Sequence, residues 1–274
     1  MSKPRNLAAK RSARRGRNEA LPGQPTELRL IPIPLPSEIK PGDSLAEKCL
    51  QSMHQSRQTF EAGDILAVKH KIVSKSEGRI VDLATIKASR KSTAWAEKYK
   101  LDARVIELAI SESRAIIRQK QGVLITQTRH GFICANSGVD VSNVDGGRHA
   151  LLLPADPDRS ARKLHRELKK RTGLAIPVLI TDTFGRPWRE GLVDVCIGIA
   201  GMKALRDDRG RHDPHGYILQ ASLEAVADEL AAAAALVCGK LNRTPACIVR
   251  GFSYKTARGR ARDLIRPSAR DLFR

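Results

Sequence analysis

Polar side chains gather in clusters where predicted strands end. The first cluster, 74–79, follows the predicted strand 64–73 and contains Lys75, whose ammonium can pair with phosphate as a point charge. The second, 135–143, holds Asp140 among small turn residues, so a carboxylate and an amide can converge on a hard cation, which prefers oxygen ligands. Taken alone, each of these two clusters is better explained as an ordinary turn.

A third cluster, 182–191, follows the buried-looking run 175–181 and is harder to explain by turn chemistry. Asp182 and Thr183 offer adjacent carboxylate and hydroxyl oxygens, while Arg186 and Arg189 offer bidentate anion binding. Together the three clusters predict a site for a divalent metal ion and a polyphosphate.

The common nucleotide-binding fingerprints are absent from the sequence. There is no GxxxxGK[ST], and no GxGxxG that follows a strand and opens a helix. His212 and His215 have a spacing that zinc could use, but a histidine-rich surface loop explains them better. A nucleotide that binds this chain therefore does so without the usual glycine-rich cradle.

The elements that must position these clusters mix strands and helices without a regular βαβ rhythm, which favours an α+β fold with a mixed sheet. Pro32 and Pro34 confine the first strand to a sheet edge. Gly173 fits the C-terminal cap of a helix. We expect strands over 28–35, 64–73, 122–128, 132–136, 175–181, 194–200 and 246–250, and helices over 44–60, 94–120, 158–172 and 223–237.

Composition excludes several classes of protein. Of the 274 residues, 41% are hydrophobic and only 4% aromatic, so an aliphatic core is expected and a wholly disordered chain is excluded. The longest apolar run, 230–238, is far shorter than the roughly 20 residues that span a bilayer. Five scattered cysteines without CxxC spacing, and no apolar stretch in residues 1–20, favour reduced thiols in the cytoplasm.

The net charge of +20 is concentrated at both ends of the chain. Residues 1–20 contribute +6 and residues 255–274 contribute +5, leaving +9 between them. We expect 1–24 and 255–274 to be basic tails that stay solvated or dock weakly on polyanions; the first also has the composition of a transit peptide. The +9 body suggests a site for anionic small molecules or a nucleic-acid surface.

In order and in content, these clusters resemble the coenzyme F420-0:L-glutamate ligase (F420-0 gamma-glutamyl ligase) family. The resemblance extends over about 28–252, which we expect to lie in one catalytic domain, 25–254. The stretches 182–191 and 135–143 are the most specific. The others are 39–43, 73–79, 227–230 and the loop at 239–240.

This resemblance implies a homodimer with an intertwined α+β fold, and a role for each matching residue. Asp140 and Asp182 match metal ligands, and Thr183 matches a ligand of a second metal. We assign catalytic roles to Lys75, Asp182, Arg186 and Arg189. The nucleotide-binding positions are Pro36, Ser37, Glu38, Ile39, His70, Lys71, Lys75, Asn143, Gly239 and Lys240. The family implies GTP as co-substrate and Mn²⁺ or Mg²⁺, and a monovalent cation such as K⁺ stays open.

The chemistry implied by the family is amide formation through an acyl phosphate. The γ-phosphoryl group of GTP activates the carboxylate of the deazaflavin precursor, and the amine of L-glutamate then attacks it. A GTP-dependent amide ligase for another small carboxylate is an alternative that the sequence does not separate from this one. A basic RNA-associated protein is a second alternative, but few aromatic residues are available for base stacking, so nucleic acid is expected to bind only weakly, through the tails.

Overall fold

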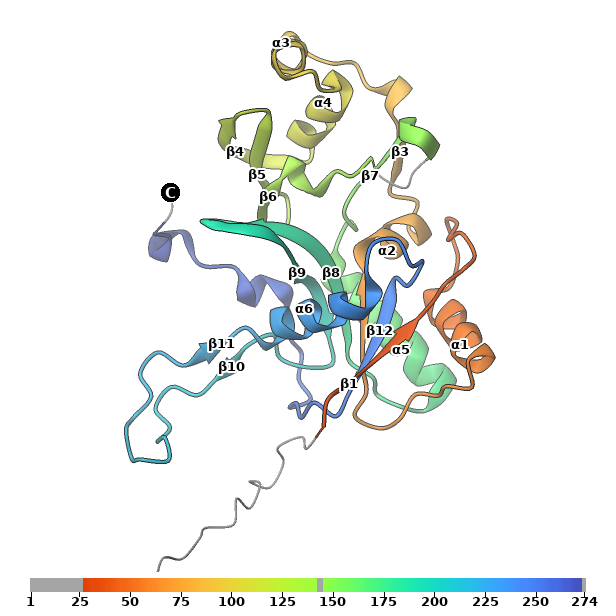
Figure 1. Cartoon of the computed structure of the whole chain (residues 1–274), viewed down its shortest axis with the longest axis vertical. Coiled ribbons are helices and arrows are strands. Elements are labelled where there is room, and N and C mark those ends of the chain that lie inside the picture. The colour runs from red at the N-terminus through yellow and green to blue at the C-terminus, as the bar shows by residue number, and fades with distance from the viewer. Residues whose placement is uncertain (1–26, 142–144, 273–274) are drawn as a thin grey trace, which may run out of the picture.

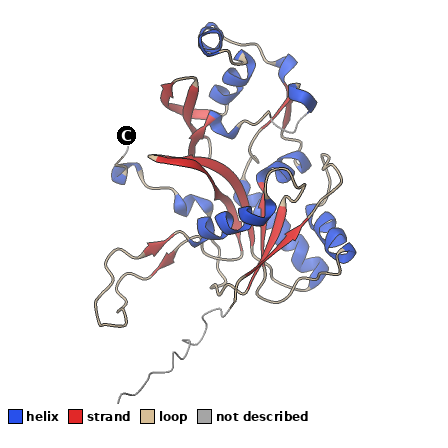
Figure 2. Ribbon diagram, in the orientation of Figure 1, coloured by secondary structure: helices blue, strands red, loops and turns tan. Residues whose placement is uncertain are grey.

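The computed structural model describes residues 27–141 and 145–272, so the N-terminal tail and Asn143 lie outside the described residues. Its centre is a mixed sheet in which β2 and β8 run parallel and the other neighbours are antiparallel (Figures 1 and 2). Across the sheet the strands are β1 (Arg29–Ile33), β12 (Ala246–Arg250), β2 (Ile65–Lys69), β8 (Val178–Arg186) and β9 (Arg189–Ala200). The predicted α+β class with a mixed sheet agrees with this arrangement.

The sheet is covered on both faces because its central strands are apolar on both sides. In β2, Leu66 and Val68 pack toward α1 (Leu45–Gln55) and α5 (Pro157–Thr172), whereas Ile65 and Ala67 pack toward α6 (Val226–Cys238). Alternate side chains of a strand point to opposite faces, so this one short strand joins two cores. The result is a helix–sheet–helix sandwich.

The predicted ends of these elements are confirmed where local chemistry sets them. β1 lies at the edge of the sheet, as Pro32 requires. Ser44 caps the start of α1 by accepting a hydrogen bond from the Glu47 amide (3.3 Å). The other end of α1 differs from the prediction, because the helix stops at Gln55. Gly173 ends α5 with φ +76°, a left-handed conformation in which glycine is not strained.

A smaller lobe, residues 80–151, stands at one end of the sandwich (Figure 1, top). Its own core includes Leu83, Leu108 and Leu124. The lobe comprises β3 (Ile80–Asp82), η1 (Leu83–Thr85), α3 (Arg90–Tyr99), α4 (Ala103–Ser111), β4 (Ser113–Lys120), β5 (Val123–Thr128), β6 (Ile133–Ala135), η2 (Asn136–Gly138), η3 (Asp145–Gly147) and β7 (His149–Leu151).

The prediction that 94–120 is mostly helical is wrong for its last part. Lys100, the residue that caps the C-terminal end of α3, is in the left-handed conformation (φ +55°). Further along the chain, β4 pairs with β5, which also forms the predicted hairpin with β6. Backbone hydrogen bonds to β5 decide the conformation of this mostly exposed segment, because its own side chains favour a strand only weakly.

The strands next to the site have different limits in the structure from those predicted, and the differences change the element on which some site residues lie. The strand predicted over 64–73 ends at Lys69, where α2 (His70–Ser76) begins, so Lys75 lies on a helix and not in a turn. The cluster 182–191 forms the far end of a long β8–β9 hairpin, because antiparallel pairing continues from Thr183↔Asp194 out to Arg186↔Arg189. The chain reverses at Pro187–Trp188.

The region predicted as helix 223–237 also starts differently. Leu223–Glu224 forms β11, which pairs with β10 (Arg206–Asp207) in an arm that projects from the body (Figure 1). α6 begins only at Val226 and extends to Cys238, where Gly239 caps it.

The C-terminal residues after 254 pack on the body, in contrast to the solvated tail expected over 255–274. Thr256 pairs with Met202, and the Ala261 amide donates to Asp158 Oδ1 (3.0 Å). Ala261 is 1% exposed and opens the short helix η4 (Ala261–Leu264), which η5 (Ser268–Arg270) follows. Main-chain pairing of this kind does not depend on the basic side chains, so charge composition alone did not reveal it.

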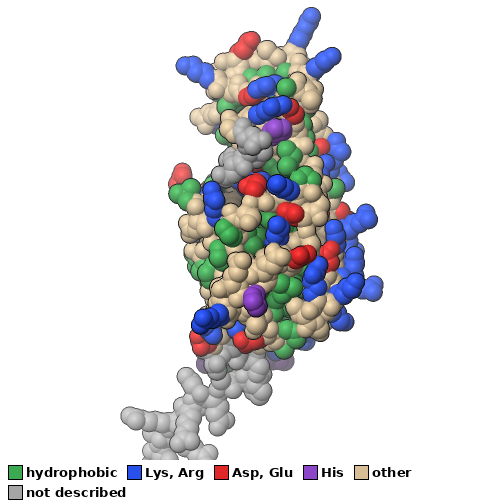
Figure 3. Space-filling model, turned by 90° about the vertical axis from the view of Figure 1, so that its right-hand side faces the viewer, with side chains coloured by type: hydrophobic (Ala, Val, Ile, Leu, Met, Phe, Trp, Pro, Cys, Tyr) green, Lys and Arg blue, Asp and Glu red, His purple; other side chains and the backbone are tan. Residues whose placement is uncertain are grey.

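The outer surface of α5 is strongly basic. Figure 3 views the molecule from the side on which α1 and α5 lie, and Lys and Arg side chains project in a group along one edge of that view. On α5 the exposed cations are Arg159, Arg162, Lys163, Arg166, Lys169, Lys170 and Arg171. In the described part of the chain, no helix combines the length and the apolar character needed to cross a bilayer.

Candidate functional site

Most of the predicted site residues that the structure describes lie at one edge of the central sheet. Ile33 at the end of β1 pairs with Ala246 at the start of β12, which in turn pairs with Val68 near the end of β2. β8 runs parallel to β2, so Asp182 continues β8 beyond the same edge. Segments that are more than 200 residues apart in the sequence are thereby brought side by side.

The first two residues of α2 hold the two aspartates that the sequence singles out. His70 Nε2 lies 3.2 Å from Asp182 Oδ1, and Lys71 Nζ lies 2.5 Å from Asp140 Oδ2. Asp182 Oδ1 also accepts a hydrogen bond from the Thr183 amide (2.7 Å). Asp140 is fixed by its backbone, which exchanges two hydrogen bonds with Leu151. Both carboxylates therefore stand beside one helix N-terminus.

Burial around Asp182 is reflected in a neighbouring thiol. Burial and, to a smaller extent, the negative charge of Asp182 raise the pKa of Cys134, on β6, to about 12. Phe132 of the small lobe also meets Phe184 of β8 edge to face, with ring centroids 6.4 Å apart. The small lobe thus covers the face of β8 on which Asp182 lies.

Thr183 faces the other side of the sheet from Asp182. Leu179 belongs to the core under α6 and Ile180 to the core under α1 and α5, and the alternation continues along β8. Thr183 accordingly donates from Oγ1 to Asp194 Oδ1 (2.8 Å), a residue directly opposite it on β9. Asp182 and Thr183, although adjacent in the sequence, therefore lie on opposite faces of the sheet.

Asp194 and Lys69 are members of this edge that the sequence prediction missed. Lys69 Nζ forms an ion pair with Asp194 Oδ2, which also accepts from Thr181 Oγ1 (3.1 Å). Asp194 is only 4% exposed. The signal was present in the sequence, because an aspartate within an otherwise apolar strand requires a buried partner.

The predicted nucleotide-binding segments also adjoin one another. Lys75 forms an ion pair with Glu38, which links α2 to the segment Pro36–Ile39. The Leu35 amide donates to the Arg243 carbonyl (2.9 Å), so this segment also lies beside the loop that follows Gly239 and Lys240. The geometry brings together two of the segments that the sequence predicted for one nucleotide.

The arginines predicted to be catalytic are not brought to the aspartates. Arg186 and Arg189 pair at the end of the hairpin, four or more residues beyond Asp182, which at about 3.3 Å per residue is roughly 13 Å. Arg186 Nη2 donates to the Glu190 carbonyl (2.5 Å). Within one chain, the Arg186 guanidinium therefore bonds to the hairpin end itself.

Two other residues of the cluster 74–79, Glu77 and Arg79, form hydrogen bonds with neighbouring elements. Ser160 Oγ on α5 donates to Glu77, and Arg79 donates to Glu112 Oε2 (2.9 Å) and to the Leu153 carbonyl (3.0 Å). These contacts fix α2 against both the sandwich and the small lobe.

The donor set has the chemistry that Mg²⁺ and Mn²⁺ use when they bind with a polyphosphate. Among residues 27–141 and 145–272, no three His, Cys, Asp or Glu side chains converge closely enough to hold a metal ion. Mg²⁺ typically takes one or two carboxylates and completes its shell with phosphate oxygens and water, which fits Asp140 and Asp182. Asn136 Oδ1, in the same cluster as Asp140, is buried and accepts no hydrogen bond, so an oxygen ligand is also available there.

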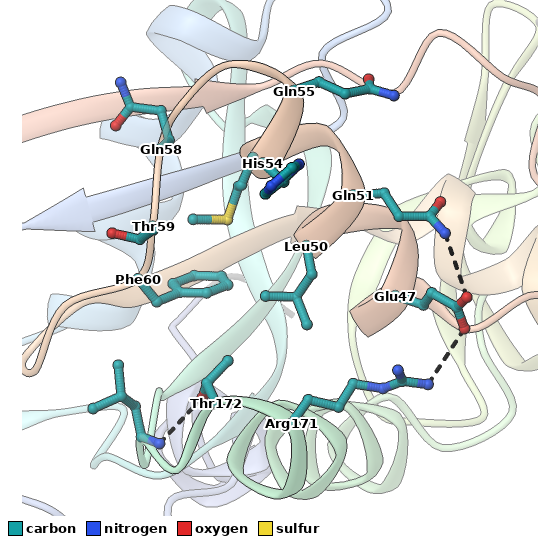
Figure 4. Close-up of a pocket in the computed structure, with 12 residues that line it drawn as sticks. Glu47, Leu50, Gln51, His54, Gln55, Gln58, Thr59, Phe60, Arg171 and Thr172 are labelled. Atoms are coloured by element: carbon teal, nitrogen blue, oxygen red, sulfur yellow. Dashed lines mark hydrogen bonds and ion pairs between the residues drawn. The ribbon is translucent and has the colours of Figure 1, made fainter.

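Two hollows in the described part of the chain lie away from this edge of the sheet. One of about 710 Å³ lies between the C-terminal ends of α1 and α5, where Leu50 and Phe60 form an apolar floor and Arg171 and Glu47 pair at the rim (Figure 4). It adjoins the segments that enter β2 and β8, whereas the aspartates lie at the ends where those strands leave the sheet. This hollow is therefore separate from the site.

Comparisons with known proteins show the family to which this chain is similar. The family model described as F420-0:Gamma-glutamyl ligase matches residues 33–251. The coenzyme F420:L-glutamate ligase of Methanopyrus kandleri is 43% identical over 257 residues, 92% of this chain and 99% of the relative. The proteins of the same name from Methanothermobacter thermautotrophicus and Archaeoglobus fulgidus are 42% and 38% identical, covering 85% and 86% of this chain and 93% and 92% of the relatives.

Proposed function

The chain belongs to the F420-0:gamma-glutamyl ligase family and is a ligase, and from this premise we propose that it joins L-glutamate to the carboxylate of coenzyme F420-0. The observation that carries the proposal is the 43% sequence identity to a relative that bears this name, over nearly the whole length of that relative. The gathering of the predicted site residues at one sheet edge supports it.

We propose that GTP supplies the activation. A carboxylate oxygen of the precursor attacks the γ-phosphorus, the bond to the β-phosphate oxygen breaks and GDP leaves. The amine of glutamate then attacks the acyl carbon of the resulting acyl phosphate, loses a proton and expels inorganic phosphate. Lys75 and Lys71 supply the positive charge that a polyphosphate requires at this edge.

We further propose that Asp140 and Asp182 hold a divalent cation, Mn²⁺ or Mg²⁺, and that Thr183 serves a second one on the opposite face of β8. Such a cation would offset the negative charge that develops during phosphoryl transfer. His70 orients the Asp182 carboxylate and Lys71 orients the Asp140 carboxylate. Because His70 occupies one side of Asp182 Oδ1, a cation would have to approach this oxygen from another direction.

Exposed apolar side chains support the expected homodimer. Trp188 is 80% exposed and Leu192 61% at the end of the β8–β9 hairpin, and Tyr217 and Ile218 are 62% and 50% exposed on the β10–β11 arm. Large apolar groups on projecting elements are typical of surfaces that a partner covers. A second copy of the chain is the partner that the family resemblance implies. The five buried, unpaired cysteines also fit a reducing compartment such as the cytoplasm.

The test is a mass-spectrometric assay of the purified full chain with the coenzyme precursor, GTP, manganese and L-glutamate. We expect a product heavier by one glutamyl residue, together with GDP and phosphate in equal amounts. Asp182→Ala should give none, whereas Asp263→Ala, which removes an exposed carboxylate on the C-terminal segment, should remain active. Activity with ATP but not GTP would contradict the nucleotide assignment, and glutamylation of other small carboxylates in preference to the precursor would contradict the substrate.

A further inference from the structure

A buried charge network lies behind Thr183 on the α6 face of the sheet. Asp194 Oδ1 accepts from Thr183 Oγ1 at 2.8 Å, and Asp194 Oδ2 accepts from Thr181 Oγ1 at 3.1 Å and pairs with Lys69 Nζ. Asp194 is 4% exposed and the Lys69 side chain 18%. Both oxygens of one carboxylate are thus used by groups from the neighbouring strands β8 and β2.

This network does more than a fold alone requires. A buried ion pair stabilises a fold poorly compared with apolar residues of similar size, because removing two charges from water is costly. Apolar side chains surround it, since Cys196 and Leu179 continue the α6 core along the same strands. The hydroxyl that the carboxylate fixes belongs to the residue predicted to bind a cation.

We propose that Asp194, held by Lys69, is the positioning residue for Thr183. A threonine hydroxyl has one proton and two lone pairs. Because the proton is given to Asp194 Oδ1, the lone pairs of Oγ1 must point away from the carboxylate, and its oxygen becomes a better donor to a cation. Carboxylates that orient a ligand in this way typically change metal affinity by about 10- to 100-fold when they are removed. The inference rests on the proposed function, since it concerns the second cation of that reaction.

Lys69 balances the charge of Asp194 and links it to the rest of the site. Its ammonium neutralises Asp194, so the carboxylate orients Thr183 without adding a net negative charge behind the site. Lys69 also donates its own amide to the Pro245 carbonyl (2.8 Å), which ties the network to the loop after Gly239. Lys69, His70 and Lys71 thus lie in sequence, each paired with a different aspartate.

The experiment is a double-mutant cycle on manganese binding, followed by electron paramagnetic resonance of free and bound Mn²⁺ with GTP present. Asp194→Asn in the full chain should weaken the weaker of the two manganese sites by roughly 10- to 100-fold. Thr183→Val should weaken the same site, and adding Asp194→Asn to Thr183→Val should then change it by less than about twofold, because a residue that acts through another has no further effect once that one is gone. Thr183→Ser should restore binding.

Asp64→Asn is the matched control. Asp64 is also a fully buried aspartate held by a cation, Arg250 (Nε to Oδ1, 2.8 Å), but at the opposite end of β2. It should lower the free energy of unfolding without changing manganese affinity. If Asp194→Asn fails to fold, Lys69→Met/Asp194→Asn removes both charges and should show the same loss at the Thr183 site.

Additive effects of Thr183→Val and Asp194→Asn, or a loss of affinity in Asp64→Asn as large as in Asp194→Asn, would overturn the inference. So would unchanged manganese affinity in the folded variants while the wild-type chain binds manganese and adds glutamate. A wild-type chain that adds glutamate but shows one manganese site or none overturns the inference alone. One that does neither overturns it together with the proposed function.

Discussion

His70 Nε2 lies 3.2 Å from Asp182 Oδ1, so the first residue of α2 holds the carboxylate that continues β8 beyond the sheet edge. The contact joins α2, which begins where β2 ends, to β8, the strand that runs parallel to β2. Lys71, the next residue, makes the corresponding contact with Asp140. One turn of helix therefore sets the positions of both predicted metal ligands.

Replacing either aspartate should stop catalysis and leave the fold in place. Asp182→Ala and Asp140→Ala each remove a ligand that water replaces poorly, so turnover of GTP should fall by more than the roughly 100-fold typical of residues that only orient a ligand. Folding should be affected little, because neither carboxylate is fully buried. Manganese titration beside turnover measures this; normal manganese-dependent turnover in Asp182→Ala would remove the basis for the site.

Lys75 should contribute to nucleotide affinity and little to folding. Lys75→Ala removes a charge-assisted contact of about 1.5–3 kcal/mol, or roughly 10- to 150-fold in Kd for GTP. Glu38→Gln should act in the opposite direction, since it frees Lys75 from its ion pair and removes a negative charge near the phosphates. Calorimetry of GTP binding measures both effects. The control is Lys87→Ala, which removes an exposed lysine of the small lobe. Weaker binding in Glu38→Gln would contradict the assignment.

Removing the two ends of the chain should have different effects. A chain that lacks 1–24 should keep its activity, because the family-like clusters all begin later. A chain that stops at Tyr254 should lose about 1–3 kcal/mol in its free energy of unfolding, because Asp158 is left without the Ala261 amide. Urea unfolding of the two truncated chains beside the full chain measures both. Equal stability of the shorter C-terminal form would show that the packed segment contributes nothing.

The cysteines should not react in the folded protein. Burial raises the pKa of Cys49, Cys134 and Cys247 to about 12 and that of Cys238 to about 11. Burial raises the pKa of Cys196 as well, so very little thiolate exists at neutral pH. A thiol reagent should modify none of them quickly under native conditions and all of them after unfolding. Rapid labelling of Cys238, at the end of α6, would instead indicate that the loop after it opens.

The pH dependence of stability should carry the signature of Asp158. Burial raises the pKa of this carboxyl above its usual 3.8, although the Ala261 and Ile199 amides oppose the shift. The folded state then binds more protons than the unfolded state above pH 3.8, so the free energy of unfolding falls as pH rises through this window. The stability of wild type minus that of Asp158→Asn should be greater at about pH 4 than at about pH 7. Urea unfolding at both pH values checks the sign, and an opposite trend would contradict it.

Local features of the amino-acid sequence were enough to predict candidate site residues and the limits of several elements. Asp182 and Thr183 stand out because a carboxylate and a hydroxyl at a strand end suit a metal ion, whereas the clusters of Lys75 and Asp140 look like ordinary turns until the family resemblance assigns them a role. Pro32 required an edge strand, and Gly173 required the end of a helix. These are local properties, fixed by a residue and its immediate neighbours, and they hold whatever the rest of the chain does.

Which side chains come into contact depends on how the strands pair in the folded chain. Alternation along a strand places Asp182 and Thr183 on opposite faces, but the pairing of β8 with β9 is what puts Asp194 opposite Thr183. The same applies to β4, which is a strand only because β5 supplies its hydrogen bonds, and to the C-terminal segment, whose backbone finds partners on Met202 and Asp158. Hydrogen bonds between distant segments leave no local pattern of residue types, so they become visible only when the chain is folded.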